Sequence, residues 1–483
     1  MSSSPPSLEF ASKPLEAPIR AELFGVERLE QHAESLAAAQ PVLGKSGRGR
    51  SLLPRVQDNG RVLREGYREI AKAIREERAI TPAAEWLVDN FHIVDEQLRE
   101  IRDDLPKGFY RELPKLAEGP LLGYPRVYGI AWAFVAHTDS RFDPDTLRRF
   151  VQAYQRVQPL TVGELWAVAI TLRVVLVENL RRLTESIVRA RAARQAADAL
   201  ADELLGLSGR PLEGAAWALQ EFEDAPLVTA FAVQLVQRLR DQDPAVTPAL
   251  LWLNERLADQ GTTPDDMVRV EHQRQAAMNV TVRNVIMSMG LMSALDWTEF
   301  FESVSLIDGV LQADPGYAAM DFATRDSYRH AIEELARGSR RSELEVAREV
   351  IARAASSDLH DGRQDDPGFY LVGDGRRAFE VALGFRTPLA RRLLRAYVAG
   401  AKPGYLGTIT VFTFAILTPP LLAAWTSGAG AATLLVLGLV AAFPASRTAM
   451  SASRFFPTGR TRPRRACRAT RRSWPRPARE SRA

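Results

Sequence analysis

The sequence predicts an all-α protein, built as stacked helix hairpins in a soluble region that is followed by a two-helix transmembrane hairpin. Three observations lead to this prediction. From Asn59 onward, apolar residues recur with a helical period almost without interruption. Helix-start signals, in which a capping side chain precedes a proline, recur along the same region. No charged residue occurs between Lys402 and Arg447, and two apolar blocks lie inside that run.

Five regions are expected along the chain. They are a disordered leader with one amphipathic helix (Ile19 to Ala39) and a basic linker (1–58), a helical region with a long central helix (59–260), a second helical region (261–402), a transmembrane hairpin (403–446) and an unstructured Arg-rich tail (447–483). The leader is rich in Ser and Pro, a composition typical of disorder. No fixed-period repeat is present, so a solenoid is not predicted.

Composition limits the class of protein. The chain has 483 residues, 46% of them hydrophobic, so it can bury at least one sizeable core. It has no signal-peptide pattern, and its single cysteine, Cys467, cannot form an internal disulfide. The tail after Ser446 holds twelve Arg and one acid, a net charge of +11, whereas the 51 basic and 58 acidic residues before it give −7. The folded part therefore gives no reason to propose a nucleic-acid surface.

Local signals define several helix ends. Capping residues before proline are expected to start helices at Thr81, Asp143, Thr247 and Thr263, capping-box spacing joins Thr161 to Glu164 and Ser342 to Glu345, and stop signals occur at Gly206, Gly261 and Gly338. Strand patterns are scarce. The best is FYLVG (Phe369–Gly373), which a turn dipeptide, Asp374-Gly375, follows.

A long helix is predicted from Thr161 to Leu205. Its first half, Leu165–Leu180, is apolar on nearly every face. Arg173 and Glu178 interrupt it, so the charge-free run is short for a membrane span. A buried core helix is the favoured interpretation, and a membrane span is the alternative.

The charge-free run predicts the hairpin. Its blocks, Tyr405–Trp425 and Ala431–Phe443, approach the ~20 residues that cross a bilayer, the second only marginally. Basic residues flank both ends, namely Arg386, Arg391, Arg392, Arg395 and Lys402 before and Arg447 after. Both ends are therefore expected in the cytoplasm. The alternative is a buried helical hairpin in a soluble protein.

The segment after Arg447 has no periodicity and is dominated by Arg, Pro, Ala and Ser. A GC-rich gene that is translated out of frame yields this amino-acid composition, so our hypothesis is a frameshift near Arg447. A polybasic segment that binds anionic lipid is the alternative.

Candidate catalytic motifs have simpler structural interpretations. Two DxD strings, Asp143-Pro-Asp145 and Asp241-Gln-Asp243, lie at helix boundaries, where capping and turn formation explain them better than a metal site. The six histidines (His32, His92, His137, His272, His330 and His360) lack metal-ligand spacing, and His272 and His330 are expected to be exposed or bonded at the surface. We therefore predict no catalytic, cofactor-binding or metal-binding residue in this chain.

Three further patterns have alternative interpretations. Core packing is expected for Met278, Met287, Met289 and Met292 with the apolar residues around them, Val282, Val285, Ile286 and Leu291. An internal helix seam, or else an interface with a further domain, is expected for Trp297, Phe300, Phe301 and Val304. A solvated basic face, or else a face toward an anionic bilayer, is expected for Arg181, Arg182, Arg189, Arg191 and Arg194.

Long phrases of the sequence carry a family resemblance. SALDWTEFFESVSL (293–306) and MDFATRDSYRHAIEELARGS (320–339) are similar to the cyclic β-1,2-glucan synthases of bacterial inner membranes. The segments 147–183 and 234–263 also look like that family. The resemblance covers roughly Leu121 to Ser446 and is most specific from Leu147 to Arg337.

The resemblance implies a function for the whole protein. Complete members polymerise glucose from UDP-glucose with a membrane-embedded glycosyltransferase, and a C-terminal phosphorylase-like module helps to trim and cyclise the product. It implies an N-terminal fragment at the inner membrane, with its helical region in the cytoplasm. UDP-glucose and a divalent metal would belong to the missing transferase domain, so this chain is expected to be inactive by itself. The expected partners are the lipid bilayer and either that domain or a separate catalytic chain.

The alternatives that remain open are a non-catalytic, membrane-anchored helical scaffold or interaction module, and a soluble helical interaction protein whose apolar end is buried.

Overall fold

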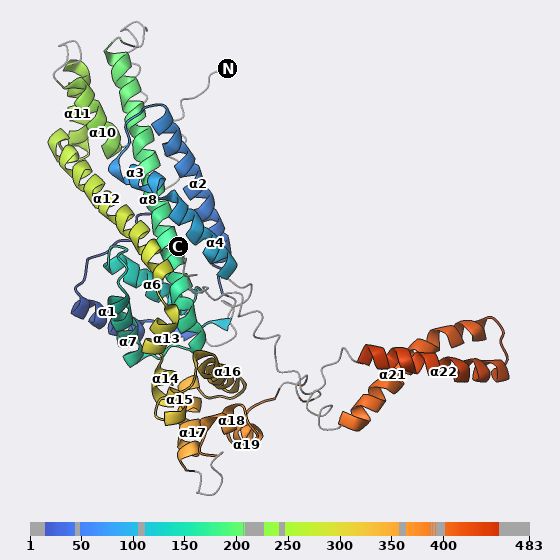
Figure 1. Ribbon diagram of the computed structural model, residues 1–483. Helices are drawn as coiled ribbons and strands as arrows, with labels where there is room; N and C mark the ends of the chain where they lie inside the picture. Colours follow the sequence, from blue (N-terminus) through green and yellow to red (C-terminus); the bar gives the residue numbers. More distant parts are fainter. Residues whose placement is uncertain are drawn as a thin grey trace, which may run out of the picture. The chain divides into compact units, whose positions relative to one another are not determined.

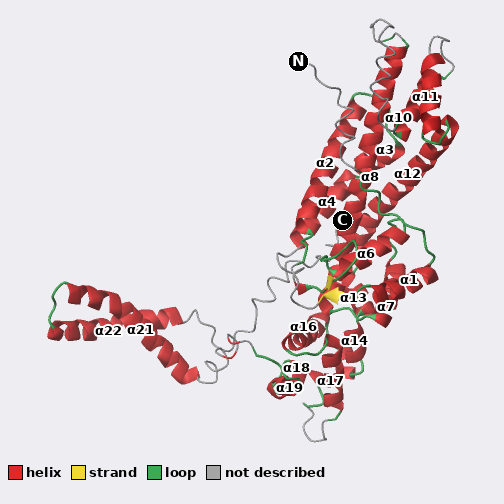
Figure 2. Cartoon of the chain, turned by 180° about the vertical axis from the view of Figure 1, so that it is seen from behind, coloured by secondary structure: helices red, strands yellow, loops and turns green. Residues whose placement is uncertain are grey.

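The structure, a computed structural model, describes residues 15–43, 49–104, 112–205, 207, 227–240, 247–356, 364–387, 389, 392 and 401–453. Most of these residues are helical, and the strands in this part of the chain form a single two-residue pair (Figure 2). The all-α prediction is therefore confirmed. The chain divides into two compact units between Leu306 and Ile307.

The first unit is a bundle of helices with one small strand pair. Its helices are α1 (Val26–Ala39), α2 (Leu53–Arg75), α3 (Pro82–Asp89), α4 (Phe91–Asp104), α6 (Arg126–His137), α7 (Pro144–Val157), α8 (Val162–Leu204), α10 (Thr229–Leu239), α11 (Thr247–Asp259), α12 (Pro264–Ala294) and α13 (Trp297–Val304). The strands β1 (Val42–Leu43) and β2 (Lys115–Leu116) pair in antiparallel register, with Val42 opposite Leu116.

The long helix α8 runs through the first unit, and α2, α4, α6, α10 and α12 pack against it (Figure 1). Thr161 and Glu164 form both hydrogen bonds of the capping box that starts it. The segment Leu165–Leu180 is buried on nearly every face. A helix that is apolar all round needs neighbours all round, and the surrounding helices supply them. The prediction of a buried core helix is confirmed.

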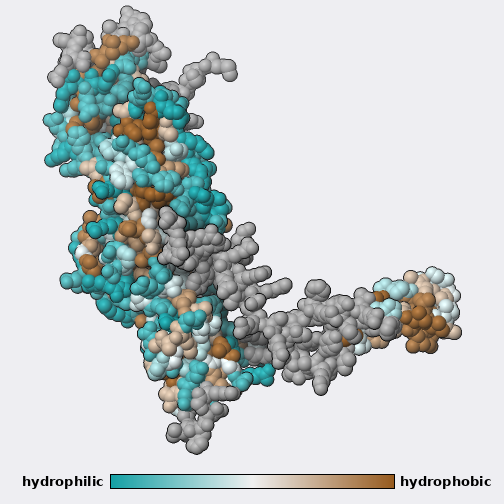
Figure 3. All heavy atoms as spheres, viewed as in Figure 1, coloured by the Kyte–Doolittle hydropathy of each residue, from teal (hydrophilic) through white to brown (hydrophobic). Residues whose placement is uncertain are grey.

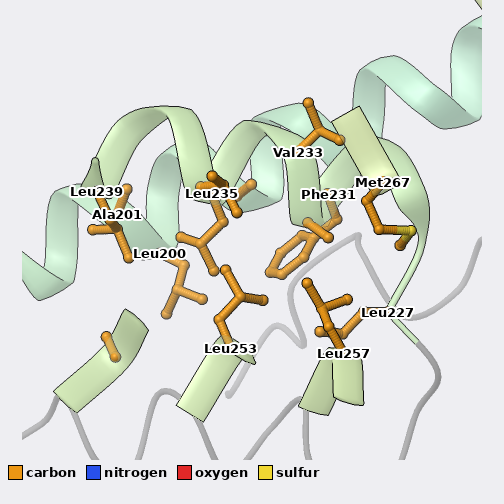
Figure 4. Close-up of a cluster of buried hydrophobic side chains, with 14 of the residues drawn as sticks. Leu200, Ala201, Leu227, Phe231, Val233, Leu235, Leu239, Leu253, Leu257 and Met267 are labelled. Carbon is orange, nitrogen blue, oxygen red and sulfur yellow. The ribbon is translucent and has the colours of Figure 1, made fainter. Parts of the chain in front are cut away.

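The C-terminal part of α8 belongs to an apolar cluster with α10, α11 and α12 (Figure 4). Its buried members include Leu200 and Ala201 of α8, Phe231, Leu235 and Leu239 of α10, Leu253 and Leu257 of α11, and Met267 of α12. These side chains recur at helical spacing on each element, so each helix contributes one apolar face. The cluster fixes the order of the helices at this end of the unit.

The second unit begins with two longer helices, α16 and α17, among several short ones. They are α14 (Leu306–Leu311), α15 (Pro315–Ala318), α16 (Phe322–Gly338), α17 (Glu343–Ala355), α18 (Pro367–Leu371) and α19 (Arg376–Ala382). Ser342 and Glu345 form the predicted capping box at the start of α17. Asp321 caps α16 by accepting a hydrogen bond from Thr324 N.

The apolar blocks form a helical hairpin. The helices α21 (Ala401–Thr426) and α22 (Ala431–Ser453) pack against each other, and Gly428, at φ +86°, lies in the turn between them. The helix α22 extends to Ser453, past the predicted start of an unstructured tail at residue 447. Residues 454–483, the leader 1–14 and the stop signal Gly206 lie outside the described residues.

Two predicted elements are wrong. The helix expected from Ile19 begins at Val26, because the backbone N and O of Ile19 bond instead to the Asn179 amide. The expected strand Phe369–Gly373 overlaps a helix, α18. Asp366 and Pro367 start that helix, since the aspartate accepts a hydrogen bond from Gly368 N.

One predicted cap is also wrong. Thr81 precedes Pro82 at the start of α3, as expected, but its hydroxyl makes no capping hydrogen bond. In contrast, Asp143 and Thr263 each accept a hydrogen bond from the third residue of their helices, Thr146 and Asp266. Proline at the first position is therefore a sufficient start signal for α3 without the cap.

Candidate functional site

Glu178, in the middle of α8, is a fully buried carboxylate. Arg55 of α2 donates to it from Nε to Oε2 at 2.8 Å and from Nη2 to Oε1 at 2.5 Å. Asn59 Nδ2 donates to Oε2 at 2.7 Å. Arg181 Nη2 and Arg182 Nε donate to Oε1 at 3.1 and 3.0 Å. We call these five residues the Glu178 cluster. One buried anion is thus satisfied by three guanidinium groups and an amide.

The cluster fixes the charge of its members. Burial by itself would raise the pKa of Glu178, but hydrogen bonding and charge from Arg55, then the Asn59 hydrogen bond and the Arg181 charge, lower it to about 2. Burial, and then the negative charge of Glu178, raise the pKa of the neighbouring Tyr128 above its usual range. At neutral pH the carboxylate therefore stays charged and the phenol stays neutral. Such groups suit rigid support better than proton exchange.

The same face of α8 holds the N-terminal segment Leu15–Gly25. The Asn179 side chain accepts from Ile19 N at 2.7 Å and donates to Ile19 O at 3.3 Å. Arg182 Nη1 donates to Ala17 O at 2.8 Å. The Asn179 amide thus satisfies both the backbone N–H and the backbone C=O of Ile19, as a neighbouring strand would do in a sheet. This segment therefore lies along the long helix without regular structure of its own.

Two more buried polar contacts tie α8 to its neighbours. Arg126 of α6 donates to both oxygens of Glu164, at 2.7 and 2.5 Å, and both side chains are buried. Arg173 Nε donates to Gln97 Oε1 of α4 at 3.0 Å and forms an ion pair with Glu100 at 3.3 Å. These contacts attach α8 to its neighbours at several points along its length. Apolar packing alone would permit the helix to slide along its axis.

A turn after α6 is held by α12. Asp139 and Ser140 have φ values of +50° and +62°, which are unfavourable for residues other than glycine. Thr281 Oγ1 donates to Asp139 Oδ1 at 2.7 Å, and Asn284 Nδ2 donates to Asp139 O at 3.1 Å. Ser288 Oγ donates to Ser140 O at 2.8 Å. Three polar residues along one face of α12 thus stabilise the turn.

The second unit has its own buried ion pair. Asp308 and Arg329 are at most 1% exposed. Arg329 donates from Nη2 to Oδ1 at 2.6 Å and from Nε to Oδ2 at 3.0 Å, and the Tyr317 hydroxyl donates to Oδ1 at 2.5 Å. This bidentate pair links α14 to α16.

The predicted solvated basic face on α8 is wrong for its first two members. Arg181 is buried and Arg182 is 11% exposed in its side chain, because the N-terminal segment contacts both and Trp132 of α6 lies against Arg182. Arg189 and Arg191 are partly exposed. Arg194 Nη1 lies 3.6 Å from the buried Glu271 carboxylate of α12.

The DxD string at Asp143 has the structural role that the sequence favours. Asp143 Oδ2 accepts from Thr146 N at 2.8 Å, and the exposed Asp145 pairs with Arg148 at 2.8 Å. The second string, at 241–243, lies outside the described residues. Within the part of the chain that is described, no three His, Cys, Asp or Glu side chains are grouped to hold a metal ion.

The histidines include one contact that the sequence did not indicate. His272 is exposed, and the exposed His330 is bonded to Asp326, which raises its pKa to about 9; both match the expectation. The rings of His32 and His137 lie 4.4 Å apart, 105 positions distant in sequence. His360 lies outside the described residues.

Core packing is confirmed for most of the apolar residues of α12. Met278, Val282, Val285, Ile286, Met289 and Met292 are buried. Met287 and Leu291 are each 51% exposed, so the prediction is wrong for these two. The aromatic stripe of α13 is an internal seam, as favoured, because Phe301 stacks on Trp166 of α8 at 4.1 Å and Trp297 lies 5.9 Å from Phe142.

Sequence reasoning missed the Glu178 cluster. A signal was present, since Glu178 is the one acid within the apolar segment Leu165–Leu180 and such a charge requires partners. Arg55 and Asn59 are four residues apart and share one face of α2. The sequence does not show that α2 packs against α8, because the two helices are far apart along the chain.

The hairpin presents an apolar surface (Figure 3). Val411, Phe414 and Trp425 of α21 are 65% exposed or more, as are Leu435 and Leu439 of α22. The segment Ile409–Thr426 is long and apolar enough to cross a membrane, and apart from Leu417 its described side chains are exposed or half-buried. In α22 the apolar stretch Ala431–Ala442 is shorter. Among the described residues one candidate span is therefore present, and the second predicted span remains a prediction.

Comparison with known proteins identifies a relative. The chain is 35% identical over 454 residues to the cyclic beta-(1,2)-glucan synthase NdvB of Rhizobium meliloti (strain 1021). It resembles one segment of a cyclic β-1,2-glucan synthase. The match covers 89% of this chain, more than the segment expected from the sequence, and confirms the resemblance. The chain spans 15% of the relative's length, which is consistent with a fragment. No family model matches the chain.

Proposed function

We propose that this chain is the N-terminal region of a membrane-bound glucosyltransferase that makes cyclic β-1,2-glucan from UDP-glucose. The observation that carries the proposal is the 35% identity to NdvB over 454 residues. In this proposal the transferase and the phosphorylase-like module lie outside this chain, on the same polypeptide or a separate one. The divalent metal and UDP-glucose would bind there.

The chain's own part is support and membrane attachment. The Glu178 cluster keeps its groups in fixed charge states, and α8 is tied to α2, α4 and α6 by buried polar contacts. Rigid elements of this kind position a neighbouring domain more precisely than loops do. The second candidate function is a non-catalytic scaffold. The fixed charges of the Glu178 cluster favour it, because they suit rigid support.

Membrane attachment is proposed through α21 and α22. Exposed apolar side chains cost about 25 cal/mol for each Å² left in water, and the hairpin has many of them without a charge between Lys402 and Arg447. A bilayer would cover both helices, although the apolar stretch of α22 would need its flanking residues to span. The basic flanks would keep both ends of the hairpin in the cytoplasm, at the inner membrane.

A chimera tests the role in synthesis. The segment of NdvB that matches this chain is replaced by this chain, and membranes are incubated with radiolabelled UDP-glucose. The chimera should make β-1,2-glucan, and NdvB lacking the segment should not. This chain alone should transfer no glucose. The proposal is overturned if the deletion retains synthesis, or if a chimera that is present at normal level in the membrane makes no product.

A further inference from the structure

The three arginines of the Glu178 cluster also meet a second carboxylate, that of Glu16 in the N-terminal segment. Their Nη2 atoms converge on one oxygen, Glu16 Oε2. Arg181 Nη2 donates a hydrogen bond to this oxygen, Arg182 Nη2 lies 3.4 Å from it and Arg55 Nη2 lies 3.8 Å from it. The arginines belong to α2 and α8, which lie side by side (Figure 1). Guanidinium groups from two helices therefore surround one oxygen position.

This oxygen position lies at the protein surface. The Glu16 side chain is 49% exposed, whereas the other carboxylate of the arginines, Glu178, is fully buried. The Arg55 side chain is 29% exposed even with Glu16 in place. Removal of Glu16 therefore uncovers the Nη2 atoms that it contacts, and a small ligand can reach them without movement of a helix.

The stretch that carries Glu16 can leave without unfolding the rest of the segment. Leu15–Ala17 is exposed and has no regular structure. Its backbone is attached through Ala17 O, which accepts from Arg182 Nη1 at 2.8 Å. The firmer anchor is Ile19, which is 2% exposed and bonded through its backbone N and O to Asn179. Ion pairs of partly exposed groups are weak, so residues 15–17 can move away while the anchor stays.

Charge and geometry favour a phosphate group in the place of Glu16. The three arginines carry three positive charges, and the carboxylates of Glu178 and Glu185, which they also contact, carry two negative ones. Glu16 thus makes the group neutral, and its departure leaves one positive charge. A phosphate group carries between one and two negative charges at neutral pH and offers three acceptor oxygens. Each guanidinium then gains an oxygen of its own, where Glu16 offers one oxygen to all three.

We propose that Arg55, Arg181 and Arg182 form a phosphate-binding site that Glu16 occupies as an internal substitute. A ligand that carries a phosphate group displaces Leu15–Ala17 and leaves the anchor at Ile19 in place. The phosphate belongs either to a small soluble molecule or to the headgroup of an anionic lipid, since both present the same oxygens. The site does not depend on the proposed function, because the contacts of Glu16 define it.

The test is the mobility of residue 15, measured by electron paramagnetic resonance. A spin label is attached at Leu15→Cys in the full chain, in which Cys467→Ser removes the native cysteine, in maltoside micelles. Inorganic phosphate should raise the mobility of the label, and sodium acetate or sodium chloride at the same ionic strength should not. A response to acetate equal to the response to phosphate overturns the proposal.

A second arm of the same experiment distinguishes the two sources of phosphate. Phosphatidylglycerol is added to the micelles without inorganic phosphate, and diacylglycerol, which lacks the phosphate, is the control. Greater mobility with phosphatidylglycerol than with diacylglycerol assigns the lipid headgroup. A response to inorganic phosphate alone assigns a soluble ligand. No response to either one overturns the proposal.

A charge variant tests the competition by Glu16. If Glu16 occupies the site for about nine-tenths of the time, Glu16→Gln should bind phosphate about tenfold more tightly than wild type in calorimetric titrations. Glu22→Gln is the matched control, because Glu22 lies in the same segment and is 63% exposed but pairs with Arg28. It should leave the affinity unchanged. The proposal is overturned if Glu16→Gln binds phosphate no more tightly than Glu22→Gln.

A second variant tests the arginines. Arg182→Lys keeps the positive charge beside Glu178 but removes the Nη2 atom that faces the ligand. It should weaken phosphate binding by about five- to tenfold, the worth of one hydrogen bond to a charged group. Arg28→Lys, in the pair with Glu22, is the control and should leave the affinity unchanged. Equal affinities in these two variants would contradict the site.

Discussion

Neutralising Glu178 tests the buried cluster most sharply. Glu178→Gln keeps the side-chain volume and removes the charge that three arginines surround. The pKa of Glu178 is lowered from 4.5 to about 2, a shift worth about 3 kcal/mol of stability at neutral pH. Removing one partner of a buried ion pair costs a similar ~3–5 kcal/mol. We expect the variant to lose about 3 kcal/mol.

The assay is urea unfolding followed by tryptophan fluorescence. Trp132 is a suitable probe, because the Arg182 guanidinium carbon lies 4.9 Å from the centre of its ring. Glu185→Gln is the matched control, since Glu185 lies on the same helix and pairs with Arg181 at 2.7 Å but is 29% exposed. It should cost less than about 1 kcal/mol. Equal losses in the two variants would refute the argument.

The cluster also predicts a pH dependence. The folded pKa of Glu178 lies below the unfolded one, so its contribution is complete above about pH 4.5 and is lost as the pH falls toward 2. Wild type should therefore lose stability over that range more steeply than Glu178→Gln. Parallel curves for the two proteins would contradict the lowered pKa.

Three further predictions concern other sites. Burial, and then the charge of His137, lower the pKa of His32 in the folded protein. The unfolded chain therefore binds a proton at His32 more readily, and stability should fall as the pH drops below about 6.5. His32→Phe should reduce that loss in unfolding midpoints measured from about pH 7.5 to 5.5, and an unchanged pH dependence would refute this prediction. Phe301→Ala should cost about 3–5 kcal/mol in urea unfolding because the ring is buried and stacked, whereas the half-exposed Met287→Ala should cost far less; similar losses would contradict the internal seam. Ser342→Ala should lower stability by about 1 kcal/mol through loss of the cap, and Ser342→Asp should restore it, unless the cap is irrelevant to α17.

Local signals in the sequence predicted much of the helical fold. The capping boxes at Thr161 and Ser342 and the caps at Asp143 and Thr263 fix helix starts through neighbouring residues, so short sequence windows contain the whole interaction. The start of the first helix was mispredicted for the opposite reason. Ile19 bonds to Asn179, 160 residues away, and no local pattern encodes that contact.

The candidate sites were less predictable. The arginines of α8 look like a solvated face in sequence, because helical spacing shows which residues share a face but not what covers it. Arg181 and Arg182 are contacted by the N-terminal segment, and Arg182 also lies against Trp132 of α6. Only tertiary packing brings such residues together.

Cysteine labelling of the hairpin tests membrane attachment most directly. In a background where Cys467→Ser removes the one native cysteine, Ser427→Cys places a thiol in the hairpin turn and Val381→Cys places one on the exposed surface of α19. Spheroplasts are treated with a membrane-impermeant maleimide before or after lysis. The account predicts that position 427 is labelled in intact spheroplasts and position 381 only after lysis. Labelling of both positions only after lysis, with the protein recovered in the soluble fraction, would contradict it.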